Sequence, residues 1–127
     1  MSELTPYICV ADARAAIEWY VEVLGAEVVF DPIIMDDGRV GHVELAADGA
    51  RWMMSEEFES AGVAAPAADR GSDVTLHLTV ADVDALAAAV EASGTAMVRG
   101  PEVTPHGQIA IFIDPFGHRW MLNQPAD

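Results

Sequence analysis

Two histidines and a carboxylate lie at spacings that could support chemistry. His42 and Glu44 are two positions apart in the β-type run 40–46, and His77 lies in the run 73–80. Alternate residues of a strand point to the same face, so His42 and Glu44 should lie side by side. Imidazole and carboxylate groups bind divalent metals, and imidazole exchanges protons near neutral pH. Three alternatives stay open: a metal site at His42, Glu44 and His77, acid/base chemistry, or simple contact with a bound ligand.

Two arginines stand at matching places in the two halves of the chain. Arg51 and Arg119 each precede the pair Trp-Met, in a chain that is otherwise strongly acidic. A guanidinium group can bind a carboxylate or phosphate through two parallel hydrogen bonds, so either arginine could hold an anionic ligand group. A structural ion pair with Glu44 is the alternative, and we favour it slightly.

Aromatic and sulfur-containing side chains complete the candidate set. They offer flat, adaptable walls for an apolar ligand, although ordinary core packing explains them equally well. Cys9 could act as a nucleophile only with His77 beside it, and the sequence contains neither a glycine-rich phosphate loop nor a nucleophile elbow. No catalytic residue is assigned. The predicted ligand-binding residues are Tyr7, Cys9, His42, Glu44, Arg51, Met53, His77, Phe112, Arg119 and Met121.

Charge is the strongest signal in the composition. The chain of 127 residues has 21 acidic residues against six arginines and a formal net charge of −15. Such a surface repels nucleic acid and anionic membranes, so we expect neither nucleic acid nor a membrane as a partner. It attracts cations, so we expect a ligand that is hydrophobic or cationic. If the ligand is cationic, Glu44 would meet its charge. Without a long apolar run or a basic N-terminal segment, we expect a cytoplasmic protein.

The elements that position these residues repeat. Val10-Ala11-Asp12 recurs as Val80-Ala81-Asp82, and Gly49-Ala50-Arg51-Trp52-Met53-Met54 is echoed by Gly117-His118-Arg119-Trp120-Met121-Leu122, each about 70 residues later. The order and spacing of the matches indicate a duplication within one domain, 1–127. We predict module 1 at about 1–57, a linker at about 58–72 and module 2 at about 73–127.

Each module is predicted to be a βαβββ unit. Asp12 and Asp82 should cap the two helices, which should end at Gly25 and Gly94. Strands are expected at 5–10, 26–30, 40–46 and 51–55, and again at 73–80, 95–99, 109–113 and 118–123, with a proline-containing loop at 100–107. The segment 114–117, Asp-Pro-Phe-Gly, is typical of a type I turn.

Alternation along the strands assigns the side chains to faces. Trp52, Met54, Trp120 and Leu122 should lie under the helices, together with Ile109, Ile111 and Ile113. This places Phe112 on the opposite face, among the candidate ligand-binding residues. Of the other histidines, His106 in a loop and His118 after the turn are expected to be exposed.

These motifs resemble one known superfamily. The duplicated βαβββ unit, Val-x-Asp before each helix, Trp19-Tyr20, Leu24-Gly25 and Asp-Pro-Phe-Gly-His-Arg-Trp at 114–120 are similar to the vicinal oxygen chelate superfamily of glyoxalase, bleomycin resistance and dioxygenase proteins, and to its small PhnB-like group. The resemblance implies an α+β fold in which curved mixed sheets surround a cleft. It also implies a homodimer.

The metal ligands of that superfamily are missing from this sequence. The resemblance places them at Thr5, Met53, Thr75 and Met121, and neither Thr nor Met suits a hard divalent cation. We therefore predict no metal and no cofactor. The favoured function is a metal-free protein that sequesters a small hydrophobic or cationic compound, such as an antibiotic. The alternatives are a lyase, isomerase or dioxygenase-like enzyme with displaced metal ligands, and a small interaction module without a ligand.

Overall fold

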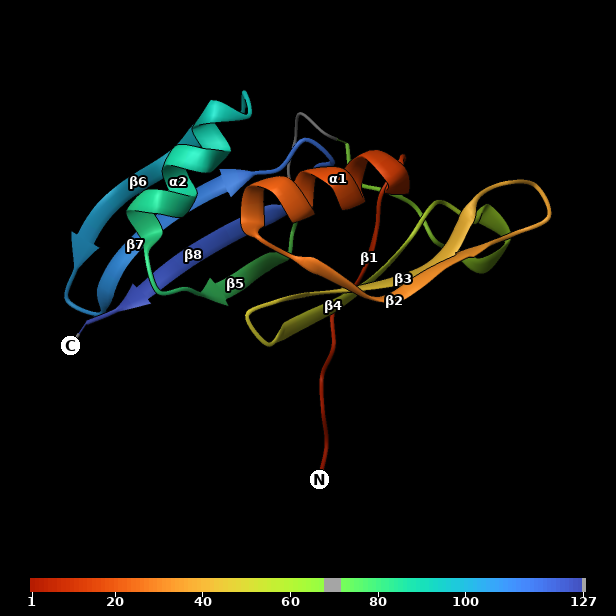
Figure 1. Ribbon diagram of the computed structural model, residues 1–127, viewed down its shortest axis with the longest axis horizontal. Coiled ribbons are helices and arrows are strands. Elements are labelled where there is room, and N and C mark those ends of the chain that lie inside the picture. The colour runs from red at the N-terminus through yellow and green to blue at the C-terminus, as the bar shows by residue number, and fades with distance from the viewer. Residues whose placement is uncertain (68–71, 127) are drawn as a thin grey trace. The chain divides into compact units, whose positions relative to one another are not determined.

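The computed structural model describes residues 1–67 and 72–126, and it contains two βαβββ modules in tandem (Figure 1). Module 1 consists of β1 (Tyr7–Cys9), α1 (Ala13–Leu24), β2 (Glu27–Ile34), β3 (Val40–Ala47) and β4 (Ala50–Ser55). Module 2 consists of β5 (Thr75–Thr79), α2 (Val83–Ala92), β6 (Met97–Thr104), β7 (Gly107–Ile113) and β8 (Arg119–Pro125).

Each module forms its own mixed sheet. The strand orders are β1-β4-β3-β2 and β5-β8-β7-β6, with the first pair of each sheet parallel and the other pairs antiparallel. The contacts divide the chain into two compact units, Met1–Ala65 and Pro66–Asp127, and a short 3-10 helix, η1 (Glu59–Ala61), lies in the predicted linker. The α+β class and the two βαβββ modules are confirmed. The enclosed cleft and the single domain stay predictions, and linker positions 68–71 lie outside the described residues.

Strand register confirms the duplication. Tyr7 pairs with Met53 in module 1, and His77 pairs with Met121 in module 2, so Tyr7 and His77 are equivalent. This equivalence carries over to the threonines two residues earlier, Thr5 and Thr75, as the sequence predicts.

Both helices begin at the predicted caps. Asp12 Oδ1 accepts a hydrogen bond from Ala15 N at 3.1 Å, and Asp82 Oδ1 accepts one from Ala85 N at 3.0 Å. Each satisfies one of the amide groups that a helix N-terminus leaves without an intrahelical partner. Gly25, at φ 71°, ends α1 in the left-handed region.

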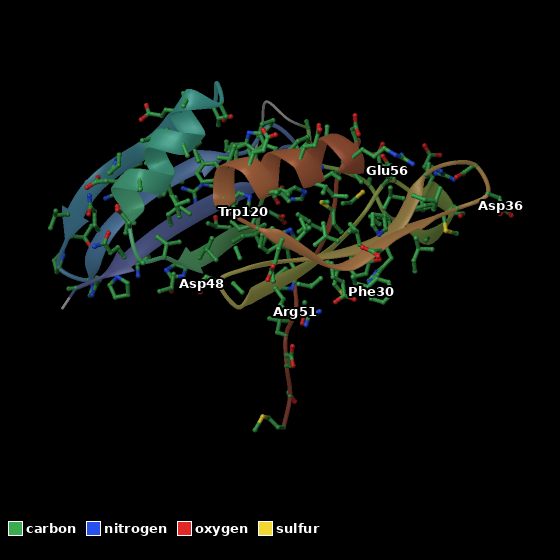
Figure 2. All side chains as sticks on the ribbon, in the orientation of Figure 1. Phe30, Asp36, Asp48, Arg51, Glu56 and Trp120 are labelled. Carbon is green, nitrogen blue, oxygen red and sulfur yellow. The ribbon has the colours of Figure 1, made fainter. Side chains whose placement is uncertain are left out.

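Each helix start has a second side-chain acceptor. In module 1 it is the residue after β4, and in module 2 it lies near the end of β8. Glu56 Oε2 accepts from Ala13 N at 2.9 Å, and Gln124 Oε1 accepts from Val83 N at 3.0 Å. Glu56 is buried, and its other oxygen accepts from Val40 N at 2.7 Å. Figure 2 shows Glu56 beside the start of α1. This residue therefore ties the helix to the sheet, a role that the sequence analysis missed.

The predicted loop at 100–107 is too long, because only residues 105 and 106 form a turn. β6 continues to Thr104. Gly100 and Pro101 form a bulge between Arg99, which pairs with Ile111, and Glu102, which pairs with Ile109. β2 has the same irregularity between Phe30 and Ile33 and continues to Ile34. Proline is tolerated in both places because β2 and β6 are edge strands.

The hairpin from β7 to β8 shows that the predicted face of Phe112 is wrong. Asp114 O accepts from Gly117 N at 3.1 Å, as in the predicted type I turn, but Asp114 N also donates to His118 O at 2.8 Å. Gly117, at φ 96°, therefore adds one residue to the loop. A shift of one residue exchanges the two faces of a strand.

As a result, Phe112 pairs with Trp120 and stacks on it, with ring centroids 6.5 Å apart and planes at 8°. Phe112 is fully buried on the face that carries Trp120 and Leu122. The side chains of Ile109, Ile111 and Ile113 lie on the opposite face, contrary to the prediction. His118 is also buried, contrary to expectation, whereas His106 is exposed. Trp52 and Met54 are buried as predicted, and they share a face with Leu45 and Val43.

The buried carboxylate of Asp114 holds this hairpin together. Oδ1 accepts from Phe116 N at 2.9 Å and His118 N at 3.0 Å, and Oδ2 accepts from Trp120 Nε1 at 2.8 Å. Replacing Asp114 with Ala leaves these donors without an acceptor.

We expect Asp114→Ala to lower the free energy of unfolding by about 3 kcal/mol, because buried donors that lose a charged acceptor are costly. Asp48→Asn, in the corresponding exposed hairpin at φ 47°, is the control and should change it by less than about 0.5 kcal/mol, since Asn tolerates that conformation. Urea denaturation of both variants measures the difference. Equal stability of the two variants would contradict this role for Asp114.

Candidate functional site

One face of the module 1 sheet gathers most of the predicted site residues. Because cross-strand partners share a face, the pairs Tyr7–Met53, Glu44–Met53 and Ala46–Arg51 place their side chains opposite Trp52 and Met54. We call the face away from α1 the open face. Figure 2 shows Phe30 and Arg51 on this side of the sheet. Its side chains include those of Tyr7, Phe30, Ile33, His42, Glu44, Arg51 and Met53.

Four of these residues form a continuous hydrogen-bonded chain, here the polar chain. Tyr7 Oη lies 2.7 Å from His42 Nδ1, and His42 Nε2 lies 2.9 Å from Glu44 Oε2. Arg51 Nη2 donates to Glu44 Oε1 at 2.7 Å. Each residue comes from a different strand or from alternate positions of β3, so the sheet itself sets their spacing. The structural pairing of Arg51 with Glu44, one of the two predicted alternatives, is present.

The polar chain changes the acidity of its members. Hydrogen bonds from His42 and then from Arg51 lower the pKa of Glu44, which keeps its carboxylate ionised at neutral pH. Partial burial and the negative charge of Glu44 raise the pKa of Tyr7, so its phenol stays protonated. The site therefore combines a fixed anion with a neutral phenol.

Apolar side chains flank the polar chain. Tyr7 and Phe30 both contact the His42 ring edge to face, with centroid distances of 5.3 and 5.4 Å. Phe30 is 46% exposed and Ile33 47%, and Met53 is partly buried next to Tyr7. Phe30 and Ile33 were missed from the sequence because the bulge at residues 31 and 32 breaks the alternation that would have assigned them to this face.

The corresponding face of module 2 is built differently. Exposed His77 replaces Tyr7 beside Met121, and Arg119 Nη1 donates to Thr75 Oγ1 at 2.7 Å. Strand pairing places Ile109 and Ile111 where module 1 has His42 and Glu44. The paired Arg99 and Glu102 occupy the positions of Phe30 and Ile33.

Cys9 lies on β1 next to Ser55 and is buried. Burial, with the charges of Glu57 and Glu56, raises the pKa of its thiol to about 11. A thiol in this state is almost entirely protonated at neutral pH, so the environment of Cys9 does not activate it as a nucleophile.

Within residues 1–67 and 72–126, no three His, Cys, Asp or Glu side chains gather as a group that could hold a metal ion. His42 and Glu44 are neighbours, but their facing atoms bond each other. His77 belongs to the sheet of module 2.

Two hollows of about 420 and 440 Å³ lie near the turn between β2 and β3, and both are lined by Arg39 and Phe58. The Arg39 guanidinium lies 4.2 Å from the centre of the Phe58 ring. None of the predicted site residues lines either hollow, so they are separate from the open face.

The comparison with known proteins agrees with this architecture. A sequence profile of the Glyoxalase/Bleomycin resistance protein/Dioxygenase superfamily matches residues 4–122. The chain belongs to this superfamily. An uncharacterized protein of Mycobacterium bovis is 33% identical over 97% of this chain and 83% of its own length.

Solved structures include TnmS3, an antibiotic-binding protein from Streptomyces sp. CB03234. It is 28% identical with a TM-score of 0.72, and the alignment covers 99% of this chain and 98% of TnmS3. TioX from Micromonospora sp. ML1 has the same fold, with 21% identity, a TM-score of 0.76 and coverage of 99% and 100%. Among the described residues, no helix is long and apolar enough to cross a membrane.

We expect Glu44→Gln to reduce stability at neutral pH but not in acid. A carboxyl whose folded pKa is depressed contributes stability above its unfolded pKa, and loses it as the pH falls through the folded value. The difference in urea midpoint between wild type and variant should therefore be full near pH 7 and shrink below about pH 4. Glu22→Gln, at an exposed position on α1, is the control. A difference that stayed constant with pH would show that the charge of Glu44 is not involved.

Proposed function

We propose that this protein binds a small, flat aromatic compound on the open face of module 1. The observation that carries the proposal is the exposure of large apolar side chains around an ordered polar chain. Phe30 and Ile33 remain about half exposed, and Tyr7 is 50% exposed although its hydroxyl is bound to His42. Ligand sites combine such apolar walls with a few fixed polar groups.

The likeness to TnmS3 supports binding over catalysis. That protein is described as antibiotic-binding and is similar to this chain along nearly its whole length. The superfamily also contains dioxygenases, so membership alone does not select a function. The residues at its usual ligand positions in this chain, Thr5, Met53, Thr75 and Met121, favour sequestration of an intact compound over metal-dependent chemistry.

The polar chain refines the expected charge of the ligand. Glu44 already accepts hydrogen bonds on both oxygens, so its main role would be to orient His42 and Arg51 rather than to bind a cation alone. The net charge of −15 would still concentrate cationic compounds near the protein. A cationic group on the ligand would thus act mainly through the rate of association.

The PhnB-like affiliation within the superfamily also stays a proposal.

A thermal-shift screen against polycyclic aromatic antibiotics tests the binding function, because a ligand of the native state raises Tm. We expect Phe30→Ala to weaken the best compound about tenfold, through loss of one aromatic wall. Val103→Ala, which changes an exposed side chain on β6, is the control and should bind as the wild type does.

Equal affinity of wild type and Phe30→Ala would contradict a site on the open face.

The enzyme alternative makes a different prediction: the purified protein would hold about one divalent ion per chain, bound through His42, Glu44 or His77. Elemental analysis of untagged protein distinguishes the two functions.

We also propose that the chain forms the homodimer that its sequence resemblance implies. Apolar residues on or next to the edge strand β2 are exposed, among them Val29, Ile34 and Met35. Light scattering after gel filtration should give about twice 13.5 kDa, and Ile34→Arg should shift the mass toward one chain. A wild-type mass near that of one chain would contradict the dimer.

A further inference from the structure

We propose that Arg51 binds a neutral oxygen acceptor of the ligand, such as the carbonyl group of an aryl ketone, while the ligand ring lies against Phe30. The inference rests on the proposed binding function and specifies the chemistry of its ligand. It follows from the position of Arg51, from its hydrogen-bond donors and from the charges around it.

Arg51 is directed toward the middle of the open face. It lies on β4, and its Nη2 donates to Glu44 Oε1 on the neighbouring inner strand β3 at 2.7 Å. Glu44 in turn pairs with Phe30 on β2. The Arg51 and Phe30 side chains therefore flank the same carboxylate. Neighbouring strands lie about 4.8 Å apart, so a compound about 10 Å long can contact both side chains at once.

The equivalent arginine of module 2 is directed toward the edge of its sheet. Arg119 Nη1 donates to Thr75 Oγ1 on the edge strand β5, at 2.7 Å. Strand pairing places Ile111 at the position that Glu44 occupies in module 1, so this position offers Arg119 no carboxylate. The comparison indicates that Glu44 is a positioning residue, which holds Arg51 over the open face.

Most donors of the Arg51 guanidinium are available to a ligand. A guanidinium group carries five N–H donors in a fixed plane. Among the residues that the structure describes, Glu44 is the one hydrogen-bond partner of Arg51, and it engages Nη2. The Arg51 side chain is 52% exposed. Because the ion pair already orders this side chain, a ligand oxygen can bind the other donors with little further loss of entropy.

The charges around Arg51 favour a neutral acceptor over an anion. Glu44 already balances the positive charge of Arg51, and the chain carries a formal net charge of −15. A ligand carboxylate would bring a second negative charge next to Glu44, and the net charge would oppose its approach. A carbonyl oxygen accepts hydrogen bonds from the guanidinium without this repulsion. A cationic group on the ligand would have to lie away from Arg51.

Three naphthalenes that share one ring system test the proposal. 2-Acetylnaphthalene carries a carbonyl group, 2-isopropylnaphthalene replaces it with an apolar group of similar shape, and 2-naphthoate carries an anion. Equilibrium dialysis of the protein against a dilute solution of each probe near pH 7 gives the three affinities. We expect the wild-type protein to bind the ketone more tightly than the naphthoate.

Arg51→Met removes the donors and keeps a long unbranched side chain. It should lower the ratio of ketone affinity to hydrocarbon affinity about tenfold, as expected for the loss of a hydrogen bond to a charged group. Arg99→Met is the matched control. Arg99 is also exposed and forms an ion pair, with Glu102 in module 2, and its loss changes the net charge by the same amount. This variant should leave the ratio unchanged.

Glu44→Ile tests the positioning role, because it gives module 1 the residue type that module 2 has at this position. It should lower the ratio of ketone affinity to hydrocarbon affinity, since Arg51 would lose the contact that directs it over the open face. A merely structural role of Glu44 would weaken both probes alike and leave the ratio unchanged.

The outcomes separate the inference from the binding function. An equal ratio in wild type and Arg51→Met would overturn the role of Arg51 alone. Tighter binding of 2-naphthoate than of the ketone by the wild type would overturn the neutral ligand class. Failure of all three probes to bind the wild-type protein would contradict the proposed binding function itself.

Discussion

Strand register decides which side chains each sheet of this protein presents on the face away from its helix. The pairs between β3 and β4 place Glu44 and Arg51 on the same side, and the single β1–β4 pairing brings Tyr7 to the same surface. If β3 were shifted by one residue against β4, Val43 and Leu45 would take the open face instead, and the core under α1 would lose them. Burial of those side chains therefore fixes the register, and the register fixes the polar chain.

The two modules show what this constraint leaves free. Both keep an acceptor side chain on the first amide of the helix, Glu56 in one and Gln124 in the other, and both have a bulged edge strand. The residues on the open face have diverged. In module 1 polar residues lie on β3 and apolar ones on β2, whereas module 2 has isoleucines on β7 and an ion pair on β6. Helix anchoring is thus common to both modules, and among the described residues the Tyr7–His42–Glu44 hydrogen bonds belong to module 1.

Within module 1, the acidity of the chain and the order of the polar groups have separate effects. The net charge acts at long range and is screened by salt over roughly 8 Å at physiological ionic strength. The Tyr7–His42–Glu44 contacts act at hydrogen-bond distance and depend on direction. A carboxylate in a strongly acidic protein would by itself suggest a cation site. Here Glu44 is already hydrogen-bonded on both oxygens, so its charge is used within the polar chain.

The sequence by itself determined the local elements and the duplication. Asp12 and Asp82 as caps, the face shared by His42, Glu44, Arg51 and Met53, and the tandem βαβββ plan follow from side-chain chemistry and strand periodicity, which are local properties. Only the tertiary structure decided what depends on register and bulges. Phe112 lies on the face of Trp120 because Gly117 adds one residue to a loop, and Phe30 lies on the open face because a bulge reset the alternation in β2. The link from Tyr7 to His42 joins residues on strands that are not neighbours, so no local pattern could have revealed it.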